Sequence, residues 1–299
     1  MDQSVSIKPY MAGFVFAVLV GFSFLSVKVC VPIASTIEIL TFRYNFAFIG
    51  ASFLVLFKFA KPEVKGKPSR AFLLSAALYI AFMVFQAAGL IFSTSIESAI
   101  IFAIIPIIAK MIAGILLKEK STWKQNVFVY ISVSALIFMI VKGAGDLSVN
   151  IFGIFLLAVS SICLAFSNVL MRYVREVYSP FSISYKIAAF GAIAFNIGYF
   201  AYMPAAGRSI LTYFDPCVHP EFLMATAYLG ILCILASAWL MSYMLANMEA
   251  VKATMFGNLS TAISIIAGVA VLREPLAFYN IVCAIMIVIS VIGVSASRH

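Results

Sequence analysis

Three positively charged side chains lie inside long apolar stretches of this sequence, at Arg43, Lys110 and Lys186. A charge in the middle of an apolar segment is costly, so such a residue usually faces a partner or a polar cavity. Ammonium and guanidinium groups bind carboxylates and phosphates, and arginine can do so through two parallel hydrogen bonds. These three residues are therefore the first candidates for chemistry, and the chemistry they suggest is the binding of an anionic group.

Lys110 is the most informative of the three. It lies thirteen residues after Glu97 and eight before Lys118, which in a helix places it about 20 Å from one end and about 12 Å from the other. Residues spaced by four share one face of a helix, and this face holds Ser98, Phe102, Pro106, Lys110 and Gly114. We expect Lys110 to line a cavity and to meet an anionic group. The alternative is a lysine whose stem runs along its own helix to the interface.

Arg43 and Lys186 occupy matching positions, because each lies seven residues after a hydroxyl residue, Thr36 and Ser179 respectively. Glu38 is five residues from Arg43, so the two do not share a helix face well. Arg43 is interpreted as one half of a structural ion pair with a group on another helix, with bidentate binding of a substrate carboxylate as the alternative. For Lys186 two interpretations stay open, cavity lining and extension to the interface.

Other polar residues in apolar stretches are candidates for lining a small-molecule pocket, which commonly combines aromatic walls with a few hydrogen-bonding groups; they are Gln86, Trp239, Tyr243, Asn258 and Asn168. Glu97 and Lys252 lie at the starts of two apolar stretches that match each other between the halves of the chain. They are candidate gates on opposite faces of the membrane, and the alternative is that they are interfacial charges at helix ends. Glu119 and Glu274 follow helix ends beside basic residues, where local ion pairing is expected.

The composition indicates the environment in which these residues lie. Of 299 residues, 64% are hydrophobic and only 10% are charged, and the mean hydropathy is +1.12. A soluble fold of this length could not hide so much apolar surface. This argues against a soluble enzyme, a nucleic-acid-binding domain and a secreted disulfide scaffold. The net charge of +9 is attributed to cytoplasmic loops of a membrane protein.

Apolar runs bounded by charges, proline and glycine predict an all-α integral membrane protein, because a spanning helix needs about 20 apolar residues. Ten transmembrane helices are expected, at about 10–27, 37–57, 71–92, 98–117, 126–142, 151–171, 181–203, 222–246, 253–272 and 278–296. If the N-terminus is cytoplasmic, the inside segments hold 13 Lys and Arg and the outside segments hold 4. The positive-inside rule therefore predicts that both termini are cytoplasmic.

The chain also contains a weak internal repeat. Glu119 aligns with Glu274 at an offset of 155, and Arg43 aligns with Lys186 at an offset of 143. Residues 10–142 and 151–296 are thus expected to form two repeats of five helices each. Because five is odd, the second repeat enters the membrane from the opposite side, which gives an inverted pair of the kind found in many carriers.

Several residues resemble a known family, the drug/metabolite transporter superfamily in its EamA-type branch. The resemblance rests on Gly21–Phe24, on Arg43, on the run from Ser98 through Pro106 to Glu119, and on Glu274–Pro275. It departs from the family at Phe22 or Phe24, where a Trp is usual, and at Thr261, where a Pro is usual. The resemblance implies two repeats around a central substrate cavity. The family includes exporters of amino acids and related metabolites, drug exporters and sugar-related carriers.

The expected function is a secondary transporter, and specifically an exporter, of small polar metabolites such as amino acids or other carboxylate-bearing compounds, by alternating access. The alternatives are a channel-like or sensory membrane protein, or a drug or cation exporter of the same superfamily. No P-loop motif occurs, so the chain is not expected to use ATP.

No enzymatic activity, metal, cofactor or nucleic-acid partner is expected. The expected partners are a small-molecule substrate and the lipid bilayer, with a monomer or a homodimer in a bacterial inner membrane. Of the five cysteines, Cys30 and Cys217 are the pair considered for a disulfide, because both are placed near the outer face.

Overall fold

The structure of this chain is a computed structural model that describes residues 7–65, 70–92, 101–102, 104–119, 122–143, 151–207, 209–272 and 278–296. Helices account for nearly all of the described residues, and an isolated bridge joins Val64 to Tyr178. The helical elements in the described ranges are α1 (Lys8–Cys30), α2 (Thr36–Leu56), α3 (Arg70–Phe92), α5 (Ile105–Leu116), α6 (Trp123–Gly143), α7 (Ile151–Tyr173), α8 (Pro180–Ala205), the 3₁₀ helix η1 (Ile210–Val218), α9 (Pro220–Ala227), the π-helix η2 (Tyr228–Ala236), α10 (Ser237–Asn247), α11 (Ala250–Leu272) and α12 (Phe278–Ala296).

Five segments within the described residues are long and apolar enough to cross a membrane: Thr36–Leu56, Arg70–Gly89, Ile151–Tyr173, Pro180–Ala205 and Pro220–Asn247. Their bounds agree with the expected spans to within a few residues. The chain is thus an all-helical, multi-pass membrane protein. The last of the five segments combines α9, η2 and α10, so a π-helix interrupts what the sequence predicts as one regular helix.

Within the described part of the expected helix at 98–117, residues 101–102 are helical and residue 104 lies in a turn before α5. Helix α5 begins at Ile105, and Pro106 lies in its first turn. A proline is well suited to that position, because the first backbone N–H groups of a helix have no partner inside the helix. Pro106 therefore marks the start of α5 and does not interrupt a longer described helix.

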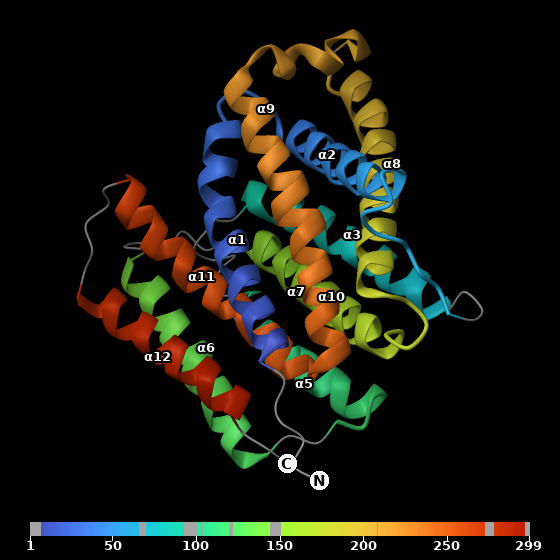
Figure 1. The fold of residues 1–299 in the computed structure, drawn as a ribbon. Coiled ribbons are helices and arrows are strands. Elements are labelled where there is room, and N and C mark those ends of the chain that lie inside the picture. Colours follow the sequence, from blue (N-terminus) through green and yellow to red (C-terminus); the bar gives the residue numbers. More distant parts are fainter. Residues whose placement is uncertain are drawn as a thin grey trace.

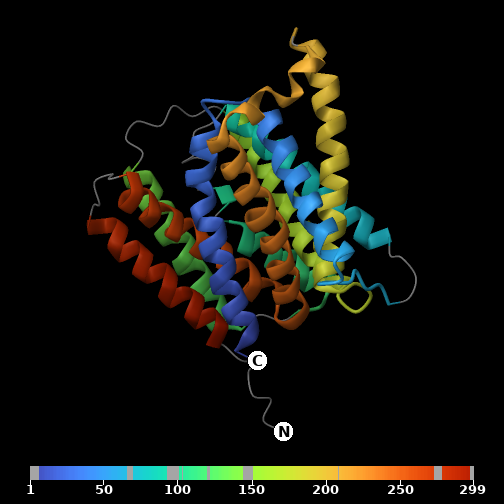
Figure 2. The same ribbon diagram turned by 45° about the horizontal axis from the view of Figure 1, so that its top comes forward.

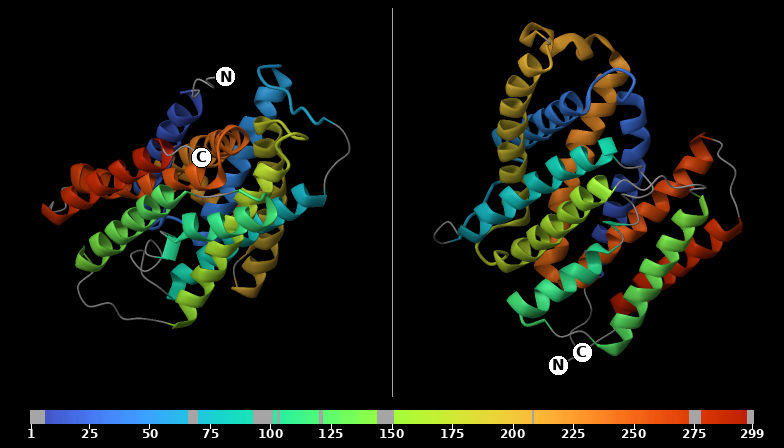
Figure 3. Two further views of the ribbon diagram at one scale, coloured as in Figure 1. Left: turned by 90° about the horizontal axis from the view of Figure 1, so that it is seen from below. Right: turned by 180° about the vertical axis from the view of Figure 1, so that it is seen from behind.

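Helices of the first half pack mainly against helices of the second half. Helix α3 lies along α7 and α6 lies along α12, as the view from behind shows (Figure 3). Helix α1 packs on α11 and on α10, α5 packs on α7, and α2 packs on α8. We compare the halves by exchanging α1, α2, α3, α5 and α6, in that order, with α7, α8, the 220–247 segment, α11 and α12. The α2–α8 and α6–α12 contacts then map onto themselves, and each of the other contacts maps onto another contact of the same set.

The connecting segments gather at two opposite ends of the molecule. Helix α1 begins and α12 ends at one end, whereas η1 lies at the other (Figures 1 and 2). At the first end, the segment before α3 pairs with the segment before α8: Lys65 N–H donates to the Val177 carbonyl oxygen at 2.7 Å, and Ser179 N–H donates to that of Glu63 at 3.1 Å. At the η1 end, Cys30 and Ile39 share an apolar cluster with Phe222 and Leu229.

Candidate functional site

A charged network joins the two halves at the end where α1 begins; it consists of Glu119, Gln125, Arg172, Glu249 and Lys252. The guanidinium of Arg172, in the last turn of α7, forms a hydrogen-bonded ion pair with the carboxylate of Glu119, which follows α5. Gln125 of α6 donates from Nε2 to Glu249 Oε2 at 3.0 Å, and Glu249 forms an ion pair with Lys252 at 3.2 Å. The first half thus contributes Glu119 and Gln125, and the second half contributes the other three.

Arg172 also binds the backbone of the second half. Its Nη1 donates to the carbonyl oxygen of Leu245 at 2.8 Å and to that of Met248, at the end of α10. The other carboxylate oxygen of Glu119 accepts the backbone N–H of Ala250, at the start of α11, at 3.2 Å. The α10–α11 connection is therefore tied to the end of α5 through charge-assisted hydrogen bonds, which are stronger than neutral ones. This corrects the expectation that Glu119 pairs locally.

Lys110 lies close to the charged network. Its ammonium donates to Oδ1 of Asn126, the residue after Gln125 in the first turns of α6. The partner is a neutral amide, so this hydrogen bond does not cancel the charge of the lysine. Among the described residues, Lys110 has no ion pair.

An amide network, made of Asn45, Asn196 and Tyr213, joins the halves nearer the η1 end. Asn45 of α2 donates to the Tyr213 hydroxyl at 2.7 Å, and that hydroxyl donates to Oδ1 of Asn196 in α8 at 2.8 Å. The Asn196 amide donates back to Oδ1 of Asn45 at 2.6 Å. The three side chains form a closed ring of hydrogen bonds that holds η1 against α2 and α8.

Aromatic packing surrounds Tyr213 in this network. Its ring centroid lies 5.2 Å from that of Phe42, 4.9 Å from that of Tyr199 and 5.8 Å from that of Phe200. Burial raises the pKa of the Tyr213 phenol, while the hydrogen bond from Asn45 opposes that rise. The phenol therefore stays neutral, and able to donate to Asn196, throughout the physiological pH range.

Arg43 lies in a different environment, seven residues into α2. Its Nε is buried and has no hydrogen-bond partner in the described part of the chain, and the same is true of the hydroxyl of the fully buried Tyr44 beside it. The expected ion-pair partner on another helix is not found among the described residues. Unsatisfied buried polar groups cost about 1–3 kcal/mol each, which makes these two groups candidates for contact with a ligand, an ion or a water.

The groups around Arg43 come from four elements. Its charge acts on Cys30 of α1, Tyr44 of α2, Tyr79 of α3 and Cys233 of η2. The π-helix packs closely here, because a Cβ at Gly230 would collide with the carbonyl oxygen of Arg43. Short π-helical turns inside α-helices are frequent at functional sites.

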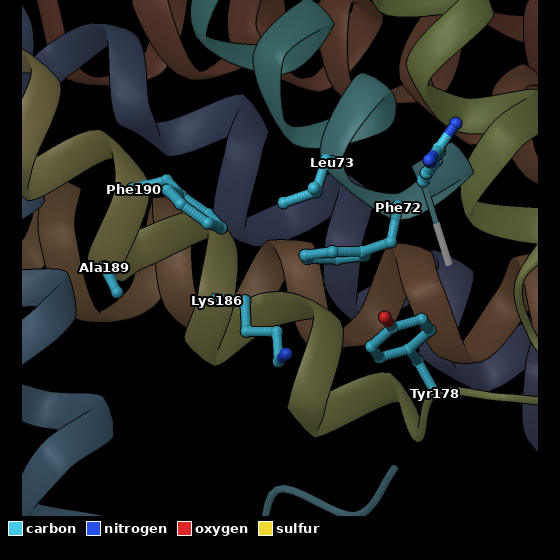
Figure 4. Close-up of a pocket in the computed structure, with 7 residues that line it drawn as sticks. Phe72, Leu73, Tyr178, Lys186, Ala189 and Phe190 are labelled. Carbon is cyan, nitrogen blue, oxygen red and sulfur yellow. The ribbon is translucent and has the colours of Figure 1, made fainter. Parts of the chain in front are cut away.

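Lys186 is separate from both networks. Its ammonium lies 5.4 Å from the ring centroid of Phe72 and 5.1 Å from that of Tyr178. Figure 4 shows the side chain extending below the Phe72 ring toward the Tyr178 ring, at the wall of a cavity of about 250 Å³. Aromatic faces attract cations, so the two rings hold the ammonium in place.

The remaining predicted site residues are dispersed over several helices. Asn258 of α11 is buried and donates to Ser132 Oγ of α6 at 3.2 Å. Asn168 of α7 is buried, while Gln86 of α3 and Tyr243 of α10 are partly buried. Trp239 is 41% exposed and packs edge-on against Phe181, with 5.7 Å between the ring centroids. Lys252 belongs to the charged network, and Glu97 lies outside the described residues.

Two further sequence expectations concern residues near these sites. Glu38 accepts hydrogen bonds from the backbone N–H of Ser35 at 2.7 Å and from its hydroxyl at 2.5 Å, which forms a capping box at the start of α2. Cys30 and Cys217 are both free cysteines, so the disulfide considered from the sequence is not formed. In the described ranges no group of three or more His, Cys, Asp or Glu side chains could hold a metal ion.

Sequence reasoning did not identify the amide network or the role of Arg172. Asn45 and Asn196 are polar amides inside apolar runs, and such residues often mark functional or packing contacts in membranes. The sequence places Arg172 only among the 13 Lys and Arg residues of the predicted inside segments. Its pairing with Glu119 depends on helix packing between residues that are 53 positions apart.

Comparison with known proteins supports a transport function. A model of the EamA-like transporter family matches residues 7–141 and again residues 151–296. The chain is 36% identical over 286 residues to an uncharacterized transporter of Bacillus subtilis (strain 168), YcxC, which covers 95% of this chain and 91% of that protein. It is also 23% identical over 257 residues to an uncharacterized transporter of Archaeoglobus fulgidus, covering 86% of this chain and 87% of the relative.

A solved crystal structure shows the same overall fold. It superposes with a TM-score of 0.79 at 11% sequence identity, over 96% of both chains. At that identity the similarity concerns the fold alone.

Proposed function

This chain belongs to the EamA-like transporter family, and we propose that it is a secondary carrier that moves a small polar metabolite across the membrane by alternating access. The observation that carries the proposal is the exchange symmetry of the helix contacts, in which each half packs on the other in the same way. Two similar halves that can exchange conformations open a central path first to one side and then to the other.

The proposed topology has ten transmembrane helices in two inverted repeats, at 10–142 and 151–296. The family model matches residues 7–141 and again residues 151–296, which supports the division into two repeats. The start of α1 and the end of α12 lie at the same end of the molecule, as an even number of crossings requires (Figure 1). In the predicted topology the inside segments hold 13 Lys and Arg and the outside segments hold 4, which supports cytoplasmic termini. The short loops favour a bacterial inner membrane as the proposed location, and the Bacillus relative supports a bacterial cell membrane in general.

The two polar networks are suited to act as gates in this mechanism. The charged network ties the halves together at the proposed cytoplasmic end, and the amide network does so nearer the other end. Each consists of side-chain hydrogen bonds that can break without unfolding a helix. Alternating access requires that the two gates open one at a time.

The proposed substrate carries a carboxylate or another anionic group. Arg43 and Lys110 both lie within apolar helices, and neither has an acidic partner among the described residues. The unsatisfied Nε of Arg43, beside the unsatisfied Tyr44 hydroxyl, is the best-placed donor for such a group. Export is proposed as the direction of net transport because the chain resembles the drug/metabolite transporter superfamily, whose members include exporters of amino acids and related metabolites.

The test is counterflow in proteoliposomes that contain the full chain. The panel contains anionic, zwitterionic, cationic and neutral metabolites, and empty liposomes are the control. Saturable accumulation of anionic or zwitterionic compounds is the expected result. Accumulation of cations alone would overturn the charge argument and favour a drug or cation exporter. Flux without saturation or exchange would favour a channel.

A further inference from the structure

Arg43 lies between two apolar clusters of the molecule. Cys30 of α1 and Cys233 of η2 belong to the first cluster, at the η1 end. Tyr44 of α2 belongs to the second cluster, and Tyr79 of α3 packs against it. The charge of Arg43 acts on all four of these residues. The guanidinium is therefore surrounded mainly by apolar and aromatic side chains.

The helices around Arg43 pack on different neighbours. Helices α1 and α2 both pack on η2, whereas α3 packs mainly on α7. The Arg43 side chain starts on α2 and acts on Tyr79 of α3, so it bridges from the first group of helices toward the second. Each group contains helices of both halves. The Nε of Arg43 is buried, so this part of the side chain does not face lipid.

Two donors in this region have no hydrogen-bond partner within the described residues. They are the Nε of Arg43 and the hydroxyl of the fully buried Tyr44. A guanidinium binds a carboxylate through two parallel hydrogen bonds, and a phenol hydroxyl can donate a third. Helix α8 fixes the ring of Tyr44, which lies 4.9 Å from the ring of Phe195 between their centroids and directly against Gly191. The hydroxyl is thus held within electrostatic range of the guanidinium.

Acidic residues are scarce inside the expected spans. Of the 11 acidic residues in the sequence, only Glu38 lies within an expected span. Glu38 is engaged at the start of α2, where it accepts two hydrogen bonds from Ser35. In the described part of the chain, the groups on which Arg43 acts are phenols and thiols. An ammonium group that entered this region would be buried without a carboxylate, which is unfavourable.

Within the proposed carrier function, on which this assignment rests, we propose that Arg43 and Tyr44 bind the carboxylate of a monocarboxylate that has an apolar or aromatic body and no ammonium group. The carboxylate accepts hydrogen bonds from the guanidinium and from the phenol hydroxyl. The apolar clusters on both sides contact the body. An α-hydroxy acid has this chemistry, whereas the amino acid of the same shape does not.

The test compares phenyllactate with phenylalanine, which differ only in the hydroxyl that replaces the α-ammonium group. Isothermal titration calorimetry of the purified full chain in detergent measures binding, and counterflow in proteoliposomes measures transport. We expect phenyllactate to bind at least about tenfold more tightly than phenylalanine, because a buried charge left without a partner weakens binding by at least that factor. This comparison uses the wild-type chain, so it does not depend on the folding of any variant.

Two variants test the assignment to these residues. Arg43→Met should lower the affinity for phenyllactate at least about tenfold, and Tyr44→Phe, which keeps the ring and its packing, should lower it about fivefold. The matched controls are Arg175→Met and Tyr173→Phe, which change exposed side chains near the end of α7. They should bind phenyllactate as the wild type does. Thermal unfolding in detergent checks that each variant is folded.

Equal or tighter binding of phenylalanine would overturn the assignment, and so would unchanged binding of phenyllactate in both Arg43→Met and Tyr44→Phe. Displacement of phenyllactate by millimolar chloride would overturn it as well, because the site would then hold an inorganic anion. If phenyllactate binds as expected but no compound shows counterflow, the carrier function fails and the binding site stands. Counterflow of amino acids alone would support the carrier function and overturn the assignment.

Discussion

The guanidinium of Arg172, at the end of α7, is bonded to the carboxylate of Glu119, which follows α5 in the other half of the chain. Glu119 also accepts the backbone N–H of Ala250, and Arg172 also donates to carbonyl oxygens at the end of α10. One ion pair thus connects the ends of α5, α7 and α10 with the start of α11. A change at either residue should affect the closing of this end of the transport path and not only local stability.

Glu119→Gln is expected to weaken the charged network. The glutamine keeps the shape of the side chain but removes its charge, so the bond to Arg172 is no longer charge-assisted on both sides. The free energy of unfolding should fall by about 1 kcal/mol, because the pair is only partly buried, and the counterflow rate should change. Thermal unfolding in detergent and counterflow in proteoliposomes measure the two effects.

The control for this change is Glu176→Gln, which removes an exposed carboxylate from the same end of the molecule. It should leave both measurements unchanged. If Glu119→Gln and Glu176→Gln behave alike, the Glu119–Arg172 pair has no role in closing the path.

Tyr213→Phe is expected to open the amide network. The substitution leaves the aromatic packing in place but removes the hydroxyl that accepts from Asn45 and donates to Asn196. Loss of these partners should lower stability by about 1–3 kcal/mol and should release η1. Hydrogen exchange over residues 210–218 should become faster. Tyr202→Phe, at an exposed tyrosine, is the control, and equal exchange in the two variants would contradict the proposed anchoring of η1.

The amide network should be insensitive to pH until strongly alkaline conditions. Burial raises the pKa of Tyr213 above its ordinary value of 10.0. A raised pKa in the folded state means that the folded chain holds this proton more tightly than the unfolded chain does. The stabilisation is therefore constant below pH 10 and is lost as the pH rises above it. Hydrogen exchange over 210–218, corrected for the intrinsic effect of pH, should show no change in protection between pH 6 and pH 9.

Arg43→Met and Lys110→Met test the proposed substrate contacts. Loss of a charged hydrogen bond to a substrate costs about 1.5–3 kcal/mol, so each change should reduce counterflow of an anionic substrate at least tenfold. The matched controls are Lys142→Met and Lys124→Met, which remove exposed cations. If Lys110→Met transports every substrate at the wild-type rate, its bond to Asn126 is only structural and Lys110 has no central role.

The helices of this protein could be predicted from the sequence because apolar run length is a local property. A spanning helix needs about 20 apolar residues because the bilayer has a fixed thickness. This requirement does not depend on which helices pack against it. The expected ranges 37–57 and 71–92 accordingly differ little from α2 and α3. Arg43, Lys110 and Lys186 could be picked out for the same reason, since a charge inside such a run is unusual in any fold.

Only the tertiary structure decided what those residues contact. Lys110 meets Asn126, Lys186 lies over Phe72 and Tyr178, and Glu119 meets Arg172. Asn126, Phe72 and Arg172 lie on neighbouring helices, and Tyr178 lies in the segment before α8. The rotation and crossing of packed helices choose such partners, and no local pattern of residues records them. The sequence by itself therefore determined that this chain crosses the membrane several times and carries embedded cations. The packing of the two halves decided which cations form a network, which line a cavity and which have no acidic partner among the described residues.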